Sequence, residues 1–131
     1  MNIFYVLKVE TVHDDENHTS VDTWTKLTKE SIAEKVIGIL DILVDESETP
    51  YEPTLKKVKG VLSEQFCILH DDLIEKEYNR LRNGWNVYVM FQKRIDELER
   101  GLENGYLTKT EFSLDIDKDT TMTVDGYYVL D

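Results

Sequence analysis

Three aspartates near the C-terminus have the spacing that opens a calcium-binding loop. Asp115, Asp117 and Asp119 are separated by single residues, and alternate carboxylates can converge on a cation that needs several oxygen ligands. An EF-hand loop also requires glycine at its sixth position and a bidentate glutamate at its twelfth. Those positions hold Thr120 and Gly126. We therefore interpret the three aspartates as an acidic turn between strands and keep a calcium-regulated module as an alternative.

The segment before this turn resembles the other half of such a loop. Gly105 and Glu111 stand at the glycine and closing-glutamate positions, but the first two ligand positions hold Arg100 and Leu102. Neither of these side chains can donate an oxygen ligand to calcium. Because each match is half a motif, we predict no metal site and no other cofactor.

Two histidines flank a short acidic run. His13 and His18 enclose Asp14, Asp15 and Glu16, and imidazole together with carboxylate can bind zinc or nickel. A polar run of this kind is more often a solvated loop. We therefore expect an acidic surface loop here and predict that its carboxylates contact a partner.

The remaining reactive side chains have ordinary structural interpretations. His70 precedes Asp71 and Asp72, and carboxylates at that place are typical of a helix start, where they cap amide groups and oppose the helix dipole. Cys67 is the only cysteine and lies in an apolar run, which favours a buried small hydrophobic residue over a nucleophile. The chain has no phosphate-binding glycine loop and no nucleophile-elbow motif. We predict that the protein is not an enzyme.

The N-terminal third has the alternation of a β-hairpin. Apolar residues recur at every second position over residues 3–12 and again over 21–27, and the segment 13–19 between them is entirely polar. Period-two runs separated by a polar segment indicate two antiparallel strands. We expect a hairpin with a long acidic loop.

Trp24 lies on the second of these strands and has two interpretations. Its same-face neighbours are Asp22 and Lys26, so the ring could be exposed and anchor a protein partner. Alternatively, the strand is slightly irregular and the ring belongs to the core. We include Asp22 and Trp24 among the predicted partner-binding residues.

The first helix has clear signals at both ends. Thr28 is a good N-cap, and Leu27 and Ile32 stand at the two positions of a hydrophobic staple. The helix should end near Asp45, because the segment 47–53 holds both prolines of the chain.

The middle of the chain predicts further helices. One begins at Thr54, with a strand over residues 66–69 as the competing interpretation. Another covers residues 72–82, where the Asp-x-x-Glu pattern at its start suggests a cap and Asn-Gly after it suggests an end. A further apolar stripe follows over residues 87–102. We therefore predict two antiparallel helices joined at Gly84.

A second hairpin closes the chain. Residues 106–116 and 122–130 alternate, with a polar turn at 117–120 between them. Thr108 and Glu111 also fit a capping box, which would start a helix instead, but the alternation is longer and favours the strand.

These elements predict one α+β domain spanning residues 1–131, in which an antiparallel sheet from the N-terminal and C-terminal β-hairpins packs against three or four helices. A length of 131 residues and 40% hydrophobic content suffice for one core. No stretch reaches the roughly 18 apolar residues of a membrane span, and the start lacks a signal-peptide pattern. We expect a soluble cytoplasmic protein without membrane contact.

Charge is the strongest functional signal in the sequence. Asp and Glu number 27 against 15 Lys and Arg. The excess is concentrated in residues 10–22 and 41–52, which contain no basic residue, and in residues 111–131, which contain only Lys118. Such a field repels nucleic acid and attracts basic protein surfaces. The predicted partner-binding residues are Asp14, Asp15, Glu16, Asp22, Trp24, Asp45, Glu46, Glu48, Asp115, Asp117 and Asp119.

In size and acidity the chain is similar to the small inhibitor proteins of phage or mobile-element type, which include anti-restriction and anti-CRISPR proteins. It is also similar in type to the immunity proteins that neutralise bacterial toxins. This similarity is one of type, carried by no shared motif, and it assigns no residue a role. It implies a small non-enzymatic inhibitor or regulator that binds a basic, nucleic-acid-handling partner in the manner of a DNA mimic. A calcium-regulated module and a toxin-immunity protein are the alternatives.

Overall fold

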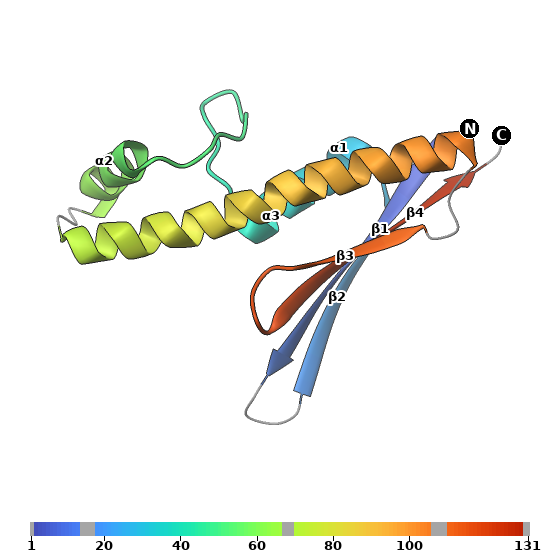
Figure 1. The fold of residues 1–131 in the computed structure, drawn as a ribbon, viewed down its shortest axis with the longest axis horizontal. Coiled ribbons are helices and arrows are strands. Elements are labelled where there is room, and N and C mark those ends of the chain that lie inside the picture. Colours follow the sequence, from blue (N-terminus) through green and yellow to red (C-terminus); the bar gives the residue numbers. More distant parts are fainter. Residues whose placement is uncertain (1, 14–17, 67–69, 106–109, 130–131) are drawn as a thin grey trace.

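The computed structural model describes residues 2–13, 18–66, 70–105 and 110–129. Two strands come first, three helices follow, and two strands end the described chain, in the predicted order (Figure 1). They are β1 (Asn2–His13), β2 (His18–Leu27), α1 (Lys29–Leu40), α2 (Leu55–Phe66), α3 (Asp71–Asn104), β3 (Glu111–Asp115) and β4 (Thr120–Val129). The α+β class is confirmed, with three helices in the described residues.

The two hairpins form one antiparallel sheet, as predicted. The strand order is β2-β1-β4-β3, so the first and last strands of the chain pair in the centre. Their register runs from Asn2 opposite Val129 to Thr11 opposite Thr120. β3 is described from Glu111, so the predicted start of this strand at 106–109 lies outside the described residues, as does Thr108 of the competing capping box.

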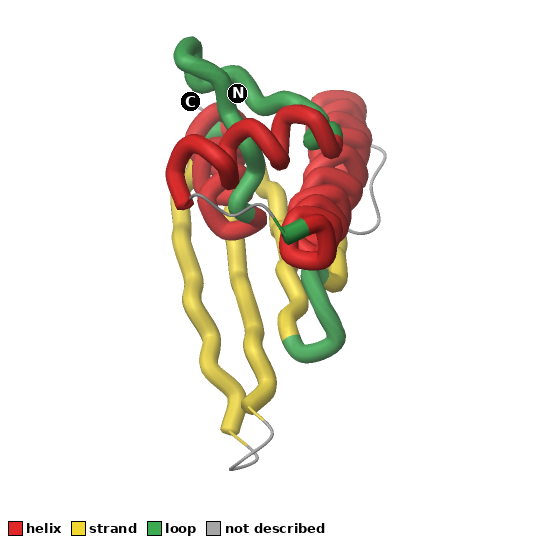
Figure 2. Tube along the Cα trace, turned by 90° about the vertical axis from the view of Figure 1, so that its left-hand side faces the viewer, coloured by secondary structure: helices red, strands yellow, loops and turns green. Residues whose placement is uncertain are grey.

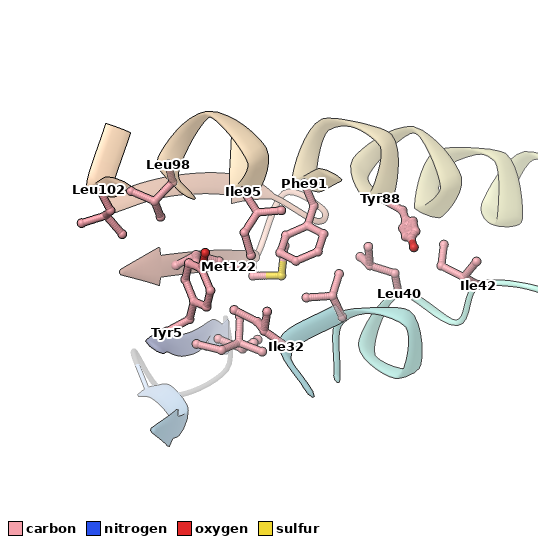
Figure 3. Close-up of a cluster of buried hydrophobic side chains, with 14 residues drawn as sticks. Tyr5, Ile32, Leu40, Ile42, Tyr88, Phe91, Ile95, Leu98, Leu102 and Met122 are labelled. Atoms are coloured by element: carbon pink, nitrogen blue, oxygen red, sulfur yellow. The ribbon is translucent and has the colours of Figure 1, made fainter. Parts of the chain in front are cut away.

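The described helices all lie on one face of this sheet. Tyr5 and Leu7 of β1 and Met122 and Val124 of β4 are fully buried, and they join residues of α1 and α3 in a single hydrophobic cluster (Figure 3). The ribbon and tube views show α1 and α3 lying along the same side of the sheet (Figures 1 and 2). Since strand side chains alternate between faces, the other set of side chains forms a face that no described helix covers. We call it the open face.

The start of α1 follows its sequence signal, whereas its end does not. The Thr28 hydroxyl oxygen accepts a hydrogen bond from the Ser31 amide at 3.1 Å, which confirms the predicted cap. The helix ends at Leu40, earlier than the predicted Asp45, because Asp41 takes the left-handed conformation at φ 56°. Aspartate tolerates this conformation better than most residues, and the Asp41 amide bonds to the Gly38 carbonyl there.

The predicted break at Gly84 is wrong, because α3 runs without interruption for 34 residues. A β-carbon on Gly84 would lie 2.8 Å from the carbonyl oxygen of Leu40 and 3.8 Å from the Ile42 side chain. Glycine therefore serves close packing of the α1 end against α3 and does not end the helix. The helix begins at Asp71 after His70, so Asp72 lies inside the first turn and does not cap it as predicted.

The first half of α3 packs on α2 and the second half on the sheet (Figure 1). The buried residues of the first half are Ile74 and Leu81, which join Val58 of α2 outside the main cluster. We call residues 55–66 and 70–82 the arm. α2 extends to Phe66, and the rest of the competing strand at 66–69 lies outside the described residues.

Candidate protein interface

The predicted partner-binding acids lie in separate regions. Three are outside the described residues: Asp14, Asp15 and Glu16. Three belong to the connector between α1 and α2: Asp45, Glu46 and Glu48. Three lie at the end of β3 and in the β3–β4 turn: Asp115, Asp117 and Asp119. The connector rises on the side of α3 away from the sheet (Figures 1 and 2), so these last two groups do not form one surface.

The connector carboxylates are partly used within their own loop. One oxygen of Asp45 accepts hydrogen bonds from the amides of Ser47 at 2.8 Å and Thr49 at 2.9 Å. Glu48 takes a left-handed conformation at φ 60°. Asp45 therefore has a structural role in shaping the connector.

Trp24 lies on the side of β2 that faces the helices. It is the cross-strand partner of Leu7, it is half-buried against the main cluster, and the Lys35 ammonium lies 5.5 Å from its ring centroid. The register shifts just beyond it, where Lys26 has φ 53°. This is the irregular strand that the core interpretation of Trp24 requires. Asp22 is opposite Val9 and so projects from the same side, away from the open face.

The β3–β4 turn brings its acids to the end of β1. Asp117 accepts a hydrogen bond from the Asp119 amide at 2.8 Å, and the Asp119 carbonyl accepts one from the Val12 amide at 2.9 Å. Asp115 accepts one from the Thr121 hydroxyl at 3.2 Å. Among the described residues no three His, Cys, Asp or Glu side chains come together as a metal site.

The open face carries the most organised set of carboxylates. Glu10 comes from β1, Glu111 and Asp115 from β3, and Asp125 from β4, and all four alternate with core-facing neighbours. Lys8 of β1 lies on the same face, next to Glu10 along the row. Its ammonium lies 2.7 Å from Glu10. The hydrogen bond to Glu10 raises the pKa of Lys8, and the charge of Glu111 acts in the same direction.

Like charges stand directly opposite each other on this face. Glu111 and Asp125 are cross-strand partners, an arrangement that destabilises a sheet. Asp125 accepts a hydrogen bond from Thr110 at 2.9 Å, and the Ser113 and Thr123 hydroxyls bond to each other at 2.9 Å in the neighbouring row. Hydroxyl groups therefore orient the carboxylates without neutralising them.

An aromatic pair borders the acids. Phe4 and Tyr127 are cross-strand partners on the open face, with ring centroids 6.0 Å apart. Aromatic side chains are frequent anchors at protein interfaces. The open face thus offers an apolar contact at one end and carboxylates along the rest.

Sequence reasoning missed Glu10, Glu111 and Asp125. It selected acids by density along the chain, whereas membership of the open face depends on strand alternation. The signal was present, because each of the three alternates with a residue predicted to be apolar and buried. Counting charge separately for each face of a strand would have identified them.

The histidines do not form a reactive cluster with other described residues. His13 and His18 are cross-strand partners with ring centroids 5.8 Å apart, and His13 Nε2 lies 3.0 Å from the Ser20 hydroxyl. His70 occupies the N-cap position of α3 without a side-chain cap bond. Cys67 lies outside the described residues.

No family model, curated protein or solved structure matches this chain. None of the helices in the described part of the chain has the length and apolar character needed to cross a membrane.

Proposed function

We propose that the protein is a non-enzymatic binding protein whose open face engages a basic surface of a protein partner. The observation that carries the proposal is the set of four carboxylates on the sheet face that no described helix covers, where Lys8 pairs with one of them, Glu10. A surface of one sign attracts a partner of the opposite sign and accelerates its association.

The opposed pair Glu111 and Asp125 supports this proposal energetically. Like charges opposite each other in a sheet cost roughly 0.2–1 kcal/mol of stability. Local rules are most often broken at functional sites, where the cost is offset elsewhere. A lysine or arginine of the partner placed between the two carboxylates would turn their repulsion into attraction.

The finer proposal is inhibition of a nucleic-acid-handling protein by mimicry of DNA. Side chains on one face of a strand recur every two residues, about 6.6 Å apart, so Glu111 and Asp115 of β3 stand about 13 Å apart along the strand, with Ser113 between them. Lys and Arg side chains that bind phosphates respond to field and spacing. An acidic sheet face would occupy such a phosphate-binding surface and exclude the nucleic acid.

Capture from a bacterial lysate tests this function. The tagged full-length chain is incubated with lysate at low salt, and bound proteins are eluted either with high salt or with duplex DNA at unchanged salt, then identified by mass spectrometry. We expect a small set of basic nucleic-acid-binding proteins released by both treatments, because both compete for the same charges. Retention of nothing, or of proteins that resist both treatments, would contradict the proposal.

A further inference from the structure

Two histidines stand opposite each other where the described pairing of β1 and β2 ends. His13 and His18 are the last cross-strand pair of a register that runs without a shift from Leu7 opposite Trp24. Their ring centroids lie 5.8 Å apart and their ring planes differ by 23°. Both side chains are exposed, and this end of the two strands projects away from the helices (Figures 1 and 2). A solute can therefore reach both imidazole rings.

Hydrogen bonds hold the backbone of β1 on both sides near this pair. β2 pairs with β1 up to His13, and on the other side of β1 the Val12 amide donates to the Asp119 carbonyl at 2.9 Å. Directly opposed residues of an antiparallel pair have their β-carbons about 4.5–5.5 Å apart. The fold therefore brings the two imidazoles together, and they lose little further freedom when they bind a common ligand.

The distance between the rings suits a shared metal ion. A metal–nitrogen bond of about 2.0–2.1 Å, with about 1.1 Å from the nitrogen to the ring centre, puts the metal about 3.2 Å from each ring centre. Two imidazoles on one tetrahedral metal then have their centres about 5 Å apart, which is close to the 5.8 Å between His13 and His18. The rings are nearly parallel, so the His18 ring must turn about χ2, a torsion that is broad for histidine. No hydrogen bond to another described residue holds that ring in place.

Ser20 supplies the kind of outer contact that metal-binding histidines have. Nε2 of His13 lies 3.0 Å from the Ser20 hydroxyl oxygen, which leaves Nδ1 of the same ring for a cation. Metal-binding histidines generally donate their other ring N–H to an oxygen atom, and this contact fixes the tautomer and the orientation of the ring. With a metal on Nδ1, Nε2 of His13 would donate its hydrogen to Ser20 Oγ.

We propose that His13 and His18 form a binding site for a divalent cation of the late first transition row, such as Zn²⁺ or Ni²⁺. Imidazole is a preferred ligand of these cations, whereas Ca²⁺ and Mg²⁺ prefer oxygen atoms. The pair supplies two ligands and leaves the other coordination positions to water. The ion joins the ends of β1 and β2, and it stabilises the hairpin because the two ligands are held together only when the strands are paired.

This site is separate from the open face. His13 continues the alternation of Val9 and Thr11 on the side of β1 opposite the open face. The proposed site uses the two imidazoles and no open-face carboxylate. The inference therefore goes beyond the proposed partner binding, and its outcome is independent of the lysate experiment.

Calorimetric titration of the untagged full-length chain with zinc chloride tests the inference. The buffer contains excess Ca²⁺, which occupies carboxylates that attract any divalent cation. We expect one zinc ion per chain. His13→Ala and His18→Ala should each weaken zinc binding by at least about tenfold, since loss of even an outer contact of a ligand commonly costs that much. His70→Ala is the matched control, because His70 is also exposed but lies at the start of α3, and it should bind zinc like the native chain.

Nitrogen NMR of the imidazole rings gives a second measurement on the unaltered chain. Zinc should shift the ring nitrogen signals of His13 and His18 and leave those of His70 unchanged. Absence of zinc binding, binding that Ca²⁺ abolishes, or binding that survives the loss of either opposed histidine would overturn the inference. Equal shifts at all three histidines would also overturn it.

Discussion

At the scale of single residues, the Tyr5 hydroxyl is a buried polar group that lacks a hydrogen-bond partner among the described residues. The Tyr5 side chain is fully buried on β1. Burial, followed by the negative charge of Glu99, raises the pKa of the phenol from 10.0 to about 12. Lys29 bridges Asp96 at 2.8 Å and Glu99 at 3.2 Å beside it.

Tyr5→Phe should therefore stabilise the fold. Removing a buried hydroxyl that lacks a partner recovers a desolvation cost of about 1 kcal/mol, which urea denaturation at neutral pH would measure as a higher transition midpoint. A lower midpoint would show that the hydroxyl is satisfied in solution.

The same variant should change the dependence of stability on pH. Above pH 10 the unfolded chain loses the phenol proton, whereas the folded protein keeps it to about pH 12. Stability that is fully present below pH 10 is thus lost as pH rises toward 12, at about 1.4 kcal/mol per pH unit. The advantage of Tyr5→Phe over the native chain should widen across this interval, and a constant difference would contradict the assignment.

At the scale of elements, replacing glycine by alanine should lower the stability of the fold at position 84 and raise it at position 38. Gly84→Ala places a β-carbon 2.8 Å from the Leu40 carbonyl oxygen, so it should destabilise the fold by about 1–3 kcal/mol through overpacking. Gly38→Ala meets nothing within 4 Å and should stabilise α1 by about 0.5–1 kcal/mol. Urea denaturation measures both, and a Gly84→Ala variant as stable as the native chain would contradict the close approach of α1 to α3.

Gly84 also shows why the boundaries of the helices could be predicted only in part from the sequence. Strand alternation and the Thr28 cap are local signals, and the structure confirms both hairpins and the start of α1. Gly84 lies inside α3 and packs closely against Leu40, a contact with a residue distant in the sequence that the local pattern Asn83-Gly84 does not reveal. The early end of α1 at Leu40 likewise depends on the conformation of Asp41.

At the scale of the whole molecule, the fold places acidic side chains on surfaces that cannot be read from the density of acidic residues along the sequence. The excess of acids predicted an anionic surface, but the connector group Asp45, Glu46 and Glu48 lies on the opposite side of α3 from the sheet. The open face instead combines acids from three strands of one antiparallel sheet. Which acids share a surface depends on strand order and register, and neither follows from composition.

Two surfaces of different character result. The open face is acidic and suits a basic partner, whereas the arm is nearly neutral and carries exposed apolar side chains. Raising the salt concentration should therefore weaken partner binding at the open face.

The most direct test compares two variants that each lose three negative charges. One is Glu111→Gln, Asp115→Asn and Asp125→Asn on the open face. The other is Asp45→Asn, Glu46→Gln and Glu48→Gln on the connector, where the Asn oxygen can keep the bonds to Ser47 and Thr49.

Calorimetric titration of both variants with the captured partner at low salt measures their affinities. The open-face variant should lose about tenfold or more in affinity while the connector variant stays close to the native chain. Equal affinities of the two variants would show that net charge alone, and not the open face, determines binding.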